Sequence, residues 1–424
     1  NNVAVGKNSL LANTTGHSAV AVGYGALASH TTDIGSVAIG YNALTSHTNA
    51  DGAYNVAVGY AALDANTDGH SNVGIGKNAL GANTTADNNT AMGNNALQTN
   101  TTGATNTAVG SRALQANTTA SNNVAVGYDA MYATTTGAGN TGVGRDALAA
   151  NTTGANNTAV GYLALDANTT ADNNVAVGAA ALTANTTGAS NISIGNSSLA
   201  ANTTASHNVA VGVSSLGANT TGAANLAIGS YSLDANTTAD YNIAIGYNVL
   251  SANTTGASNV AIGREALTAN TTAADNTAVG TLALTANTTG DQNVAVGSNA
   301  LDANTTGRNN IAVGKDALGV NTTGDANLAI GVAALDANTT GNYNLGLGYG
   351  ALSGNTTASD NTGVGYLAGV AISTGSYNTS MGRSALGACT TGAGNTAIGK
   401  SALAANTSDN NTAVGKEAMK DNTT

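Results

Sequence analysis

The residues that could do chemistry in this chain are few, and they recur at fixed places in a repeated pattern. His30 and His47 occupy the same place in neighbouring copies of that pattern, and the single cysteine, Cys389, occupies it in a later copy. Two histidines on neighbouring coils could bind a metal between them, but substitution at a polar turn position is the simpler explanation. Cys389 has no histidine near it in the sequence to activate it, so we interpret it as a free thiol. We therefore expect no catalytic residue, no metal site and no cofactor.

The triplet Asn-Thr-Thr recurs along the chain and fits the acceptor sequence of N-glycosylation, Asn-x-Ser/Thr. In a secreted protein such turns would be accessible, and a ladder of glycans is conceivable. Asparagine and threonine are also good turn formers, so turn formation alone is the alternative. The candidate glycan acceptors are Asn168, Asn185, Asn202, Asn219, Asn236 and Asn253.

A second recurring set consists of tyrosines and basic residues that directly follow a glycine. Eight copies of the repeat have Tyr there and eight have Lys or Arg, which accounts for eight of the 11 basic residues. Next to a turn, these side chains would form a stripe along one edge of the molecule. Tyr and Arg are favoured at binding surfaces, so the stripe could contact a ligand or a sister chain; a solvated turn is the alternative. Its members include Tyr24, Tyr41, Tyr60, Tyr128, Arg145, Tyr162, Arg264 and Lys315.

The spacing is regular because the whole chain is one repeat array. A glycine that follows Ala-Val or a similar pair recurs with a 17-residue period in 25 copies, from Gly6 to Gly415. A two-residue insertion lies near 49–54, and the copy near 361–377 is atypical. Residues 1–424 thus form a single array in which no separate cap, linker or anchor is recognised. We expect an excerpt of a longer fibre, or a subunit whose ends abut neighbours.

The elements that must position these residues follow from one copy, numbered so that Asn157 is position 1 and Asn173 is position 17. Positions 2 to 4 alternate branched, small and branched residues, which is the period of a β-strand. Position 5 is always glycine, which indicates a turn, a positive φ or a close backbone approach. Position 15 accepts Gly154 or Ala171, so it needs no positive φ. Ala-Leu-x-Ala at positions 8 to 11 predicts a second short strand.

Two short strands cannot fold alone, so each must pair with the same strand of the next copy. The sequence therefore predicts an all-β fold, a parallel β-solenoid of about 25 coils with two strands each, in which one copy of the repeat makes one coil. At one strand spacing of ~4.8 Å per coil, the array would be roughly 120 Å long. Asn157, Asn174 and Asn191 would stack into a ladder, and the Thr residues into rows. Two buried aliphatic side chains per coil stabilise less than the ordering of a whole copy costs, so we expect a homo-oligomer through an Ala/Val face.

Composition supports a thin core and excludes several functions. The chain has no Pro, Trp or Phe, and 14 tyrosines are its only aromatic residues. Small side chains fill a narrow interior but leave voids in a wide one. The formal net charge of −11 argues against nucleic acids and anionic membranes as partners. No apolar run approaches the ~18 residues of a membrane span, so this segment does not insert into a bilayer.

Three segments carry a family resemblance: "NNVAVG" at 1–6, "GSVAIG" at 35–40 and "NISIG" at 191–195. They resemble the head repeat of trimeric autotransporter adhesins, and similar repeats occur in phage-tail-fibre-like proteins. The resemblance covers the whole chain. It implies a left-handed parallel β-roll in which three chains wind about one axis at the outer end of a surface fibre. The repeat here is longer than the usual adhesin repeat, and its second half is closer to the tail-fibre-like variants.

We therefore expect a structural, non-enzymatic extracellular fibre segment, on a cell surface or a virion tail. Weak binding sites repeated on every coil would act together through avidity. Its partners would be copies of itself, as a trimer or longer fibre, and a host surface, matrix or glycan. Two alternatives are a self-assembling extracellular filament subunit and an ice-binding β-solenoid with regular Thr rows. Against the ice-binding alternative, Asn-Thr-Thr sits in a turn and not on a flat strand face.

Overall fold

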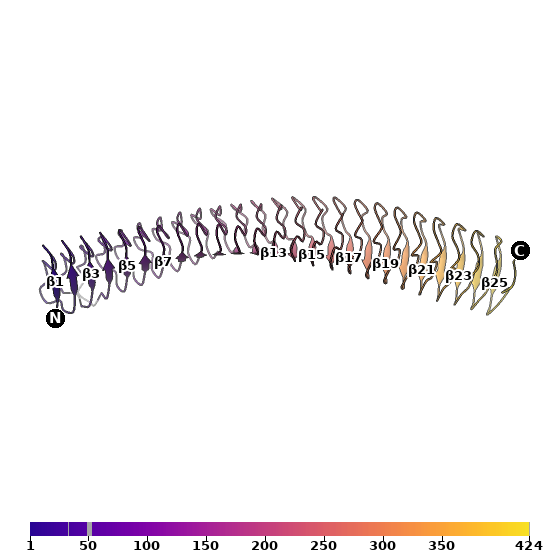
Figure 1. The fold of residues 1–424 in the computed structure, drawn as a ribbon, viewed down its shortest axis with the longest axis horizontal. Helices are drawn as coiled ribbons and strands as arrows, with labels where there is room; N and C mark the ends of the chain where they lie inside the picture. The colour runs from indigo at the N-terminus through magenta and orange to yellow at the C-terminus, as the bar shows by residue number, and fades with distance from the viewer. Residues whose placement is uncertain (33, 49–52, 424) are drawn as a thin grey trace. The chain divides into compact units, whose positions relative to one another are not determined.

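Each coil of the chain consists of one short β-strand and a series of turns. The computed structural model describes residues 1–32, 34–48 and 53–423 and divides into two compact units, Asn1–Ala210 and Val211–Thr424. These described residues contain no helix. Within each unit the strands of successive coils lie side by side (Figure 1). The prediction of an all-β parallel solenoid in which one copy of the repeat makes one coil is confirmed.

The strands are three residues long and fall at positions 2 to 4 of successive copies. In the first unit they are β1 (Val3–Val5), β2 (Val20–Val22), β3 (Val37–Ile39), β4 (Val56–Val58), β5 (Val73–Ile75), β6 (Thr90–Met92), β7 (Thr107–Val109), β8 (Val124–Val126), β9 (Thr141–Val143), β10 (Thr158–Val160), β11 (Val175–Val177) and β12 (Ile192–Ile194). Strand β13 (Val209–Val211) spans the boundary between the units. In the second unit they are β14 (Leu226–Ile228), β15 (Ile243–Ile245), β16 (Val260–Ile262), β17 (Thr277–Val279), β18 (Val294–Val296), β19 (Ile311–Val313), β20 (Leu328–Ile330), β21 (Leu345–Leu347), β22 (Thr362–Val364), β23 (Thr379–Met381), β24 (Thr396–Ile398) and β25 (Thr412–Val414).

Neighbouring strands pair in parallel with like positions opposite each other. In the first unit Ala159 lies opposite Ala176, and in the second Ala244 lies opposite Ala261. The same register holds from β1 to β12 and from β14 to β25. Of the insertion predicted near 49–54, residues 49–52 lie outside the described residues. Strands β3 and β4 on either side of it pair in register, so the extra residues do not shift the ladder.

The interior is built from six positions per coil, most of them small or polar. In the copy that starts at position 157, the buried side chains are Asn157, Ala159, Ala164, Leu165, Asn168 and Ala171. Leucine at position 9 is the only large apolar side chain among them. The core is therefore as thin as the composition predicted, and two asparagines per coil must satisfy their amides inside it.

The branched residues of the strands point away from this interior, which corrects an expectation. Ala159 is fully buried, whereas the neighbouring Val160 is 37% exposed. Because side chains along a strand alternate between its two sides, positions 2 and 4 share the outward side. We call this surface the strand face. Two buried aliphatic side chains were expected per coil; in the copy that starts at position 157, Leu165 lies fully inside and Val160 does not.

The prediction of a second strand at positions 8 to 11 is wrong, because the described residues form no strand there. Leu165 has a φ of 54° and Leu163, at position 7, has a φ of 55°. A strand cannot continue through left-handed residues, so the chain turns here and directs Leu165 inward. The left-handed conformation costs a leucine about 1–2 kcal/mol. Burying the side chain contributes about 1.5–3 kcal/mol, which offsets that cost.

The glycine at position 5 has both the positive φ and the close backbone approach that its presence in every copy predicted. Its φ lies between 122° and 148° in all 25 copies, a region that side chains disfavour. A Cβ added to Gly161 would lie 2.4 Å from the carbonyl oxygen of Gly178 on the next coil. Gly154 at position 15 has no positive φ, so that prediction is confirmed as well.

Candidate functional site

The asparagines at positions 1 and 12 form two ladders inside the coils. At position 1, the backbone N–H of Asn174 donates to Oδ1 of Asn157 at 2.9 Å. At position 12, Nδ2 of Asn168 donates to Oδ1 of Asn151, also at 2.9 Å. The ladder predicted for position 1 is confirmed. The ladder at position 12 was not predicted, although Asn recurs there in most copies.

The burial of position 12 contradicts the idea that the Asn-Thr-Thr turns present accessible amides. All six candidate glycan acceptors are fully buried. In each of them Nδ2 donates to the backbone carbonyl three residues further on, over 2.9–3.1 Å. A glycan on Nδ2 would have to replace these bonds and displace the core, so the folded coils exclude it. The six residues are Asn168, Asn185, Asn202, Asn219, Asn236 and Asn253.

The two threonines of the triplet have different roles. At position 13 the hydroxyl holds neighbouring coils together: Oγ1 of Thr152 donates to the carbonyl of Thr169 at 2.9 Å. At position 14 the side chain is exposed, as at Thr153 and Thr170. The predicted Thr rows therefore exist, but only the row at position 14 faces solvent. The ice-binding alternative rests on that single row.

The histidines and the cysteine also lie within the position 12 ladder. His30 and His47 are fully buried with ring centroids 6.5 Å apart, and Nδ2 of Asn66 lies 3.3 Å from Nδ1 of His47. Cys389 is buried, and desolvation raises the pKa of its thiol. A raised pKa keeps the sulfur protonated and a poor nucleophile. In the described part of the chain, no three His, Cys, Asp or Glu residues are grouped so as to hold a metal ion.

The stripe at position 6 lies at the surface, where the sequence placed it. Its five tyrosines Tyr24, Tyr41, Tyr60, Tyr128 and Tyr162 are 43–53% exposed. The side chains of its basic members Arg145, Arg264 and Lys315 are 58–65% exposed. In-register stacking brings like rings together, so that Tyr41 stacks with Tyr24 and with Tyr60 at centroid distances of 5.2 Å.

A denser group lies in the first unit, where residues at positions 7 and 10 join the stripe. The guanidinium carbon of Arg112 is 5.0 Å from the ring centroid of Tyr128 and 5.3 Å from that of Tyr132. Arg145 lies 6.0 Å from Tyr128 and 5.7 Å from Tyr162. We call these five residues the Arg112 cluster. Sequence reasoning named Tyr128, Arg145 and Tyr162 but missed Arg112 and Tyr132, which only the stacking of coils brings beside them.

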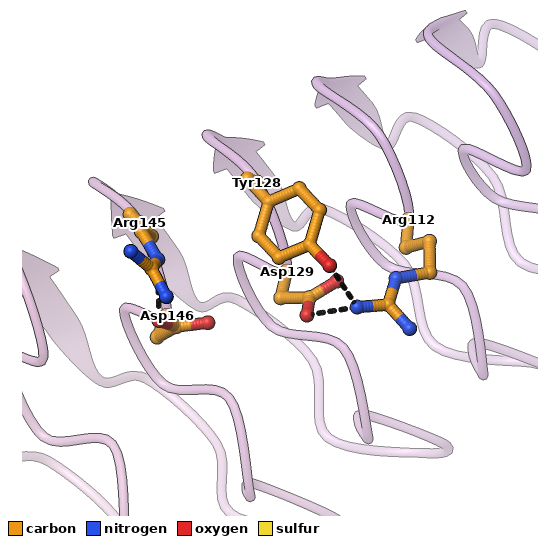
Figure 2. A network of polar contacts seen from close by, with 5 residues as sticks. All are labelled: Arg112, Tyr128, Asp129, Arg145 and Asp146. Carbon is orange, nitrogen blue, oxygen red and sulfur yellow. Dashed lines mark hydrogen bonds and ion pairs between the residues drawn. The ribbon is translucent and has the colours of Figure 1, made fainter.

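Acidic residues at position 7 pair with three of the basic residues of the stripe. Arg145 pairs with Asp146 at 3.0 Å, Arg264 with Glu265 at 3.5 Å and Lys315 with Asp316 at 3.1 Å. Arg112, itself at position 7, pairs with Asp129 on the next coil. Figure 2 shows Asp129 and Asp146 on the same surface as the two arginines. Around these paired residues the stripe is therefore amphipathic and aromatic, without the excess positive charge that a polyanion requires.

Two surface hollows form where position 10 is glycine. One, of about 440 Å³, lies around Gly81 and Asp64; the other, of about 400 Å³, lies around Gly319. In the second, Gly319 leaves a gap between Asp302 and Asp336, and the side chain of Asp316 lines it. Desolvation raises the pKa of both flanking carboxyls, the nearby Asp316 raises them further, and backbone hydrogen bonds partly oppose the shift.

These raised pKa values predict that acidification stabilises the second unit. A carboxyl whose pKa is raised by folding binds its proton more tightly in the folded state, so the unfolding free energy increases as pH falls through the folded pKa. The gain is complete below the ~3.9 of an unfolded aspartate. We expect the thermal unfolding midpoint to rise between pH 7 and pH 4. Asp302→Asn/Asp336→Asn should raise it at pH 7 and reduce its pH dependence; an unchanged pH profile in this variant would refute the assignment.

No family model matches the chain, and no curated protein matches it. The described residues also contain no helix with the length and hydropathy that crossing a bilayer requires.

Proposed function

We propose that this chain is a structural, non-enzymatic segment of an extracellular fibre, built from copies of itself packed through the strand face. The fibre would hold the position 6 stripe at regular intervals as a repeated weak binding surface. The location outside the cell, on a cell surface or a virion tail, and the trimeric state follow the resemblance to adhesin head repeats and tail-fibre-like proteins.

The exposure of the strand face is the observation that carries this proposal. Val160 and Ile194 in the first unit and Ile262, Ile330 and Ile398 in the second are 36–40% exposed. All five occupy position 4, so they form a column within each unit, and the aliphatic residues at position 2 lie on the same side. Contiguous exposed apolar surface marks an interaction site in soluble proteins. A second copy of the chain fits this surface because its own strand face has the same chemistry and the same spacing from coil to coil.

Repetition supports a binding role more than catalysis. Coils that follow one another in register place each surface position in a column, one strand spacing of ~4.8 Å per coil. Ligand contacts that are weak singly gain affinity when several act at once. A catalytic site needs unlike groups converging on one point, whereas stacking like coils multiplies one group along a line.

Charge introduced on the strand face should break the association, and a matched site two residues away gives the control. Ile330, at position 4, is 38% exposed, and Val332, at position 6, is 44% exposed. Ile330→Lys would bury a lysine between chains, so we expect a smaller species or a much weaker complex. Val332→Lys adds the same charge off the strand face and should leave association intact. Light scattering after size exclusion measures both.

The outcomes separate the proposals. A discrete trimer in the parent chain supports the fibre segment, and an open series of masses supports the filament subunit instead. A parent chain that is monomeric at all concentrations would overturn association through the strand face. Equal effects of the two lysines would show that the strand face has no special role in association.

A further inference from the structure

The side chains of the Arg112 cluster are held in place by hydrogen bonds, ion pairs and cation–π contacts together. Arg112 donates from its guanidinium to the hydroxyl of Tyr128 and to Oδ2 of Asp129. Arg145 is held by Asp146. Side chains fixed by such contacts have already lost rotamer freedom, so binding a ligand costs less entropy than on a mobile surface. The cluster is therefore a preorganised platform.

The cluster remains open to solvent although it is ordered. Tyr128 is 46% exposed, Tyr132 39% and Tyr162 49%, and the Arg145 side chain is 64% exposed. Figure 2 shows the Tyr128 ring nearly face-on in front of the ribbon, with Arg112 on its hydroxyl side. An apolar ring and several N–H and O–H groups thus face the same solvent region.

The charge balance of the cluster narrows the class of ligand. Two arginines are matched by Asp129 and Asp146, so the group is close to neutral, and the whole chain has a net charge of −11. A polyanion such as a sulfated polysaccharide or a nucleic acid is disfavoured on this surface. A purely apolar ligand would leave the guanidinium and hydroxyl donors without acceptors. Neutral sugars fit both requirements, because a pyranose ring offers an apolar C–H side and a rim of hydroxyls.

We propose that the Arg112 cluster, formed by Arg112, Tyr128, Tyr132, Arg145 and Tyr162, binds a neutral oligosaccharide. The rings of Tyr128 and Tyr162 contact the C–H sides of successive sugars. Arg112 and Arg145 donate hydrogen bonds to sugar hydroxyls while remaining paired to their aspartates. Tyr128 and Tyr162 are two coils apart, a separation of roughly 10 Å at ~4.8 Å per coil, so the site spans more than one sugar. The inference rests on the proposed function, since it names the ligand class of the surface that the fibre presents.

Titration calorimetry on the full chain tests this site. The probes are the hexasaccharides of glucose, mannose and N-acetylglucosamine, with a heparin hexasaccharide as the anionic comparison. We expect at least one neutral probe to bind with a Kd in the millimolar range, as for a weak site that acts through avidity. Tyr128→Ala/Tyr162→Ala should weaken that binding roughly tenfold or more. Tyr128→Phe keeps the ring and should retain most of the affinity.

Tyr241→Ala/Tyr343→Ala is the control, since both tyrosines are more exposed than Tyr128 and Tyr162, at 67% and 65%, but lie at position 17 and outside the cluster. It should bind the neutral probe as the parent does. No binding of any neutral probe, equal binding by all variants, or tighter binding of heparin than of every neutral probe would each overturn the inference. Light scattering on the same samples distinguishes failure of the sugar site from failure of the fibre proposal. Association without sugar binding would refute the sugar site alone. A monomeric parent chain would refute the fibre proposal.

Discussion

Gly161→Ala is expected to destabilise the first unit by about 2–6 kcal/mol, although it adds only one methyl group. The φ of Gly161 is 140°, a conformation that alanine adopts only with strain. The new Cβ would also lie 2.4 Å from the carbonyl oxygen of Gly178, a backbone atom held in the ladder by its neighbours. Neither problem can be relieved without separating two coils. Thermal unfolding followed by circular dichroism should show a lower midpoint.

Gly81→Ala is the control, because it adds the same methyl group where a shift of only a few tenths of an ångström accommodates it. Gly81 has no positive φ, and its nearest neighbour, the carbonyl oxygen of Asn78, would be 3.3 Å from the new Cβ. We expect a change within about 0.5 kcal/mol. In a repeat array each coil contacts only its neighbours, so Gly161→Ala should also split the unfolding transition in two. If both variants unfold like the parent chain, the close approach at position 5 does not limit stability.

Much of the fold could be predicted because the copies of the repeat can be aligned with one another within this one sequence. The 17-residue period, the constant Gly161 and the asparagine at Asn157 each recur in a way that only in-register stacking explains. The side of the strand that faces inward could not be predicted. Ala159 and Val160 are both apolar, and alternation alone does not state which of them belongs inside. The structure places alanine inside because the thin interior has room for one leucine per coil and for little else of that size.

The second predicted strand failed for a related reason. Ala-Leu-x-Ala is compatible with a strand in local propensity, but Leu165 reaches the interior only from a left-handed backbone. Burial of this side chain overrode the intrinsic preference of leucine, a tertiary effect that propensity does not contain. The same effect explains why Asn168 was wrongly expected to be accessible. Its Asn-Thr-Thr triplet suggests a surface turn, whereas its amide lies in the core.

The sequence predicted the column of residues along which the candidate site lies, but not all of the residues that form it. Tyr128 and Tyr162 could be named because position 6 holds tyrosine repeatedly. Arg112 and Tyr132 come from positions 7 and 10 of different copies, where neighbouring copies have other residues. Their proximity depends on how far each side chain reaches toward the next coil. Opposite charges at the same position of neighbouring copies, as at Arg112 and Asp129, were the one signal that could have found the pair.

The second large effect is expected in the atypical copy near 361–377, where Ile372→Asn should destabilise the second unit by about 2–5 kcal/mol. In this copy position 9 is Gly369, so the usual leucine is missing, and position 12 is Ile372 in place of asparagine. Ile372 is fully buried, and a Cβ added to Gly369 would lie 3.0 Å from its Cδ1, beside Cδ2 of Leu352 at 2.7 Å and Oγ of Ser380 at 2.9 Å. The isoleucine therefore fills the space that a leucine fills elsewhere. An asparagine there would restore the polar ladder but leave that space empty.

The double variant Gly369→Leu/Ile372→Asn restores the pair that other copies have, and it should recover most of the lost stability. Gly369→Leu alone should itself destabilise, by about 1–3 kcal/mol, because leucine and Ile372 would compete for one space. The φ of Gly369 is 63°, within reach of the left-handed conformation that leucine adopts at this position elsewhere. Denaturant unfolding of the four chains gives the coupling between the two positions directly. A double variant no more stable than Ile372→Asn would show that the side chains at positions 9 and 12 do not share one space. A large side chain at position 12 could then not replace the leucine at position 9.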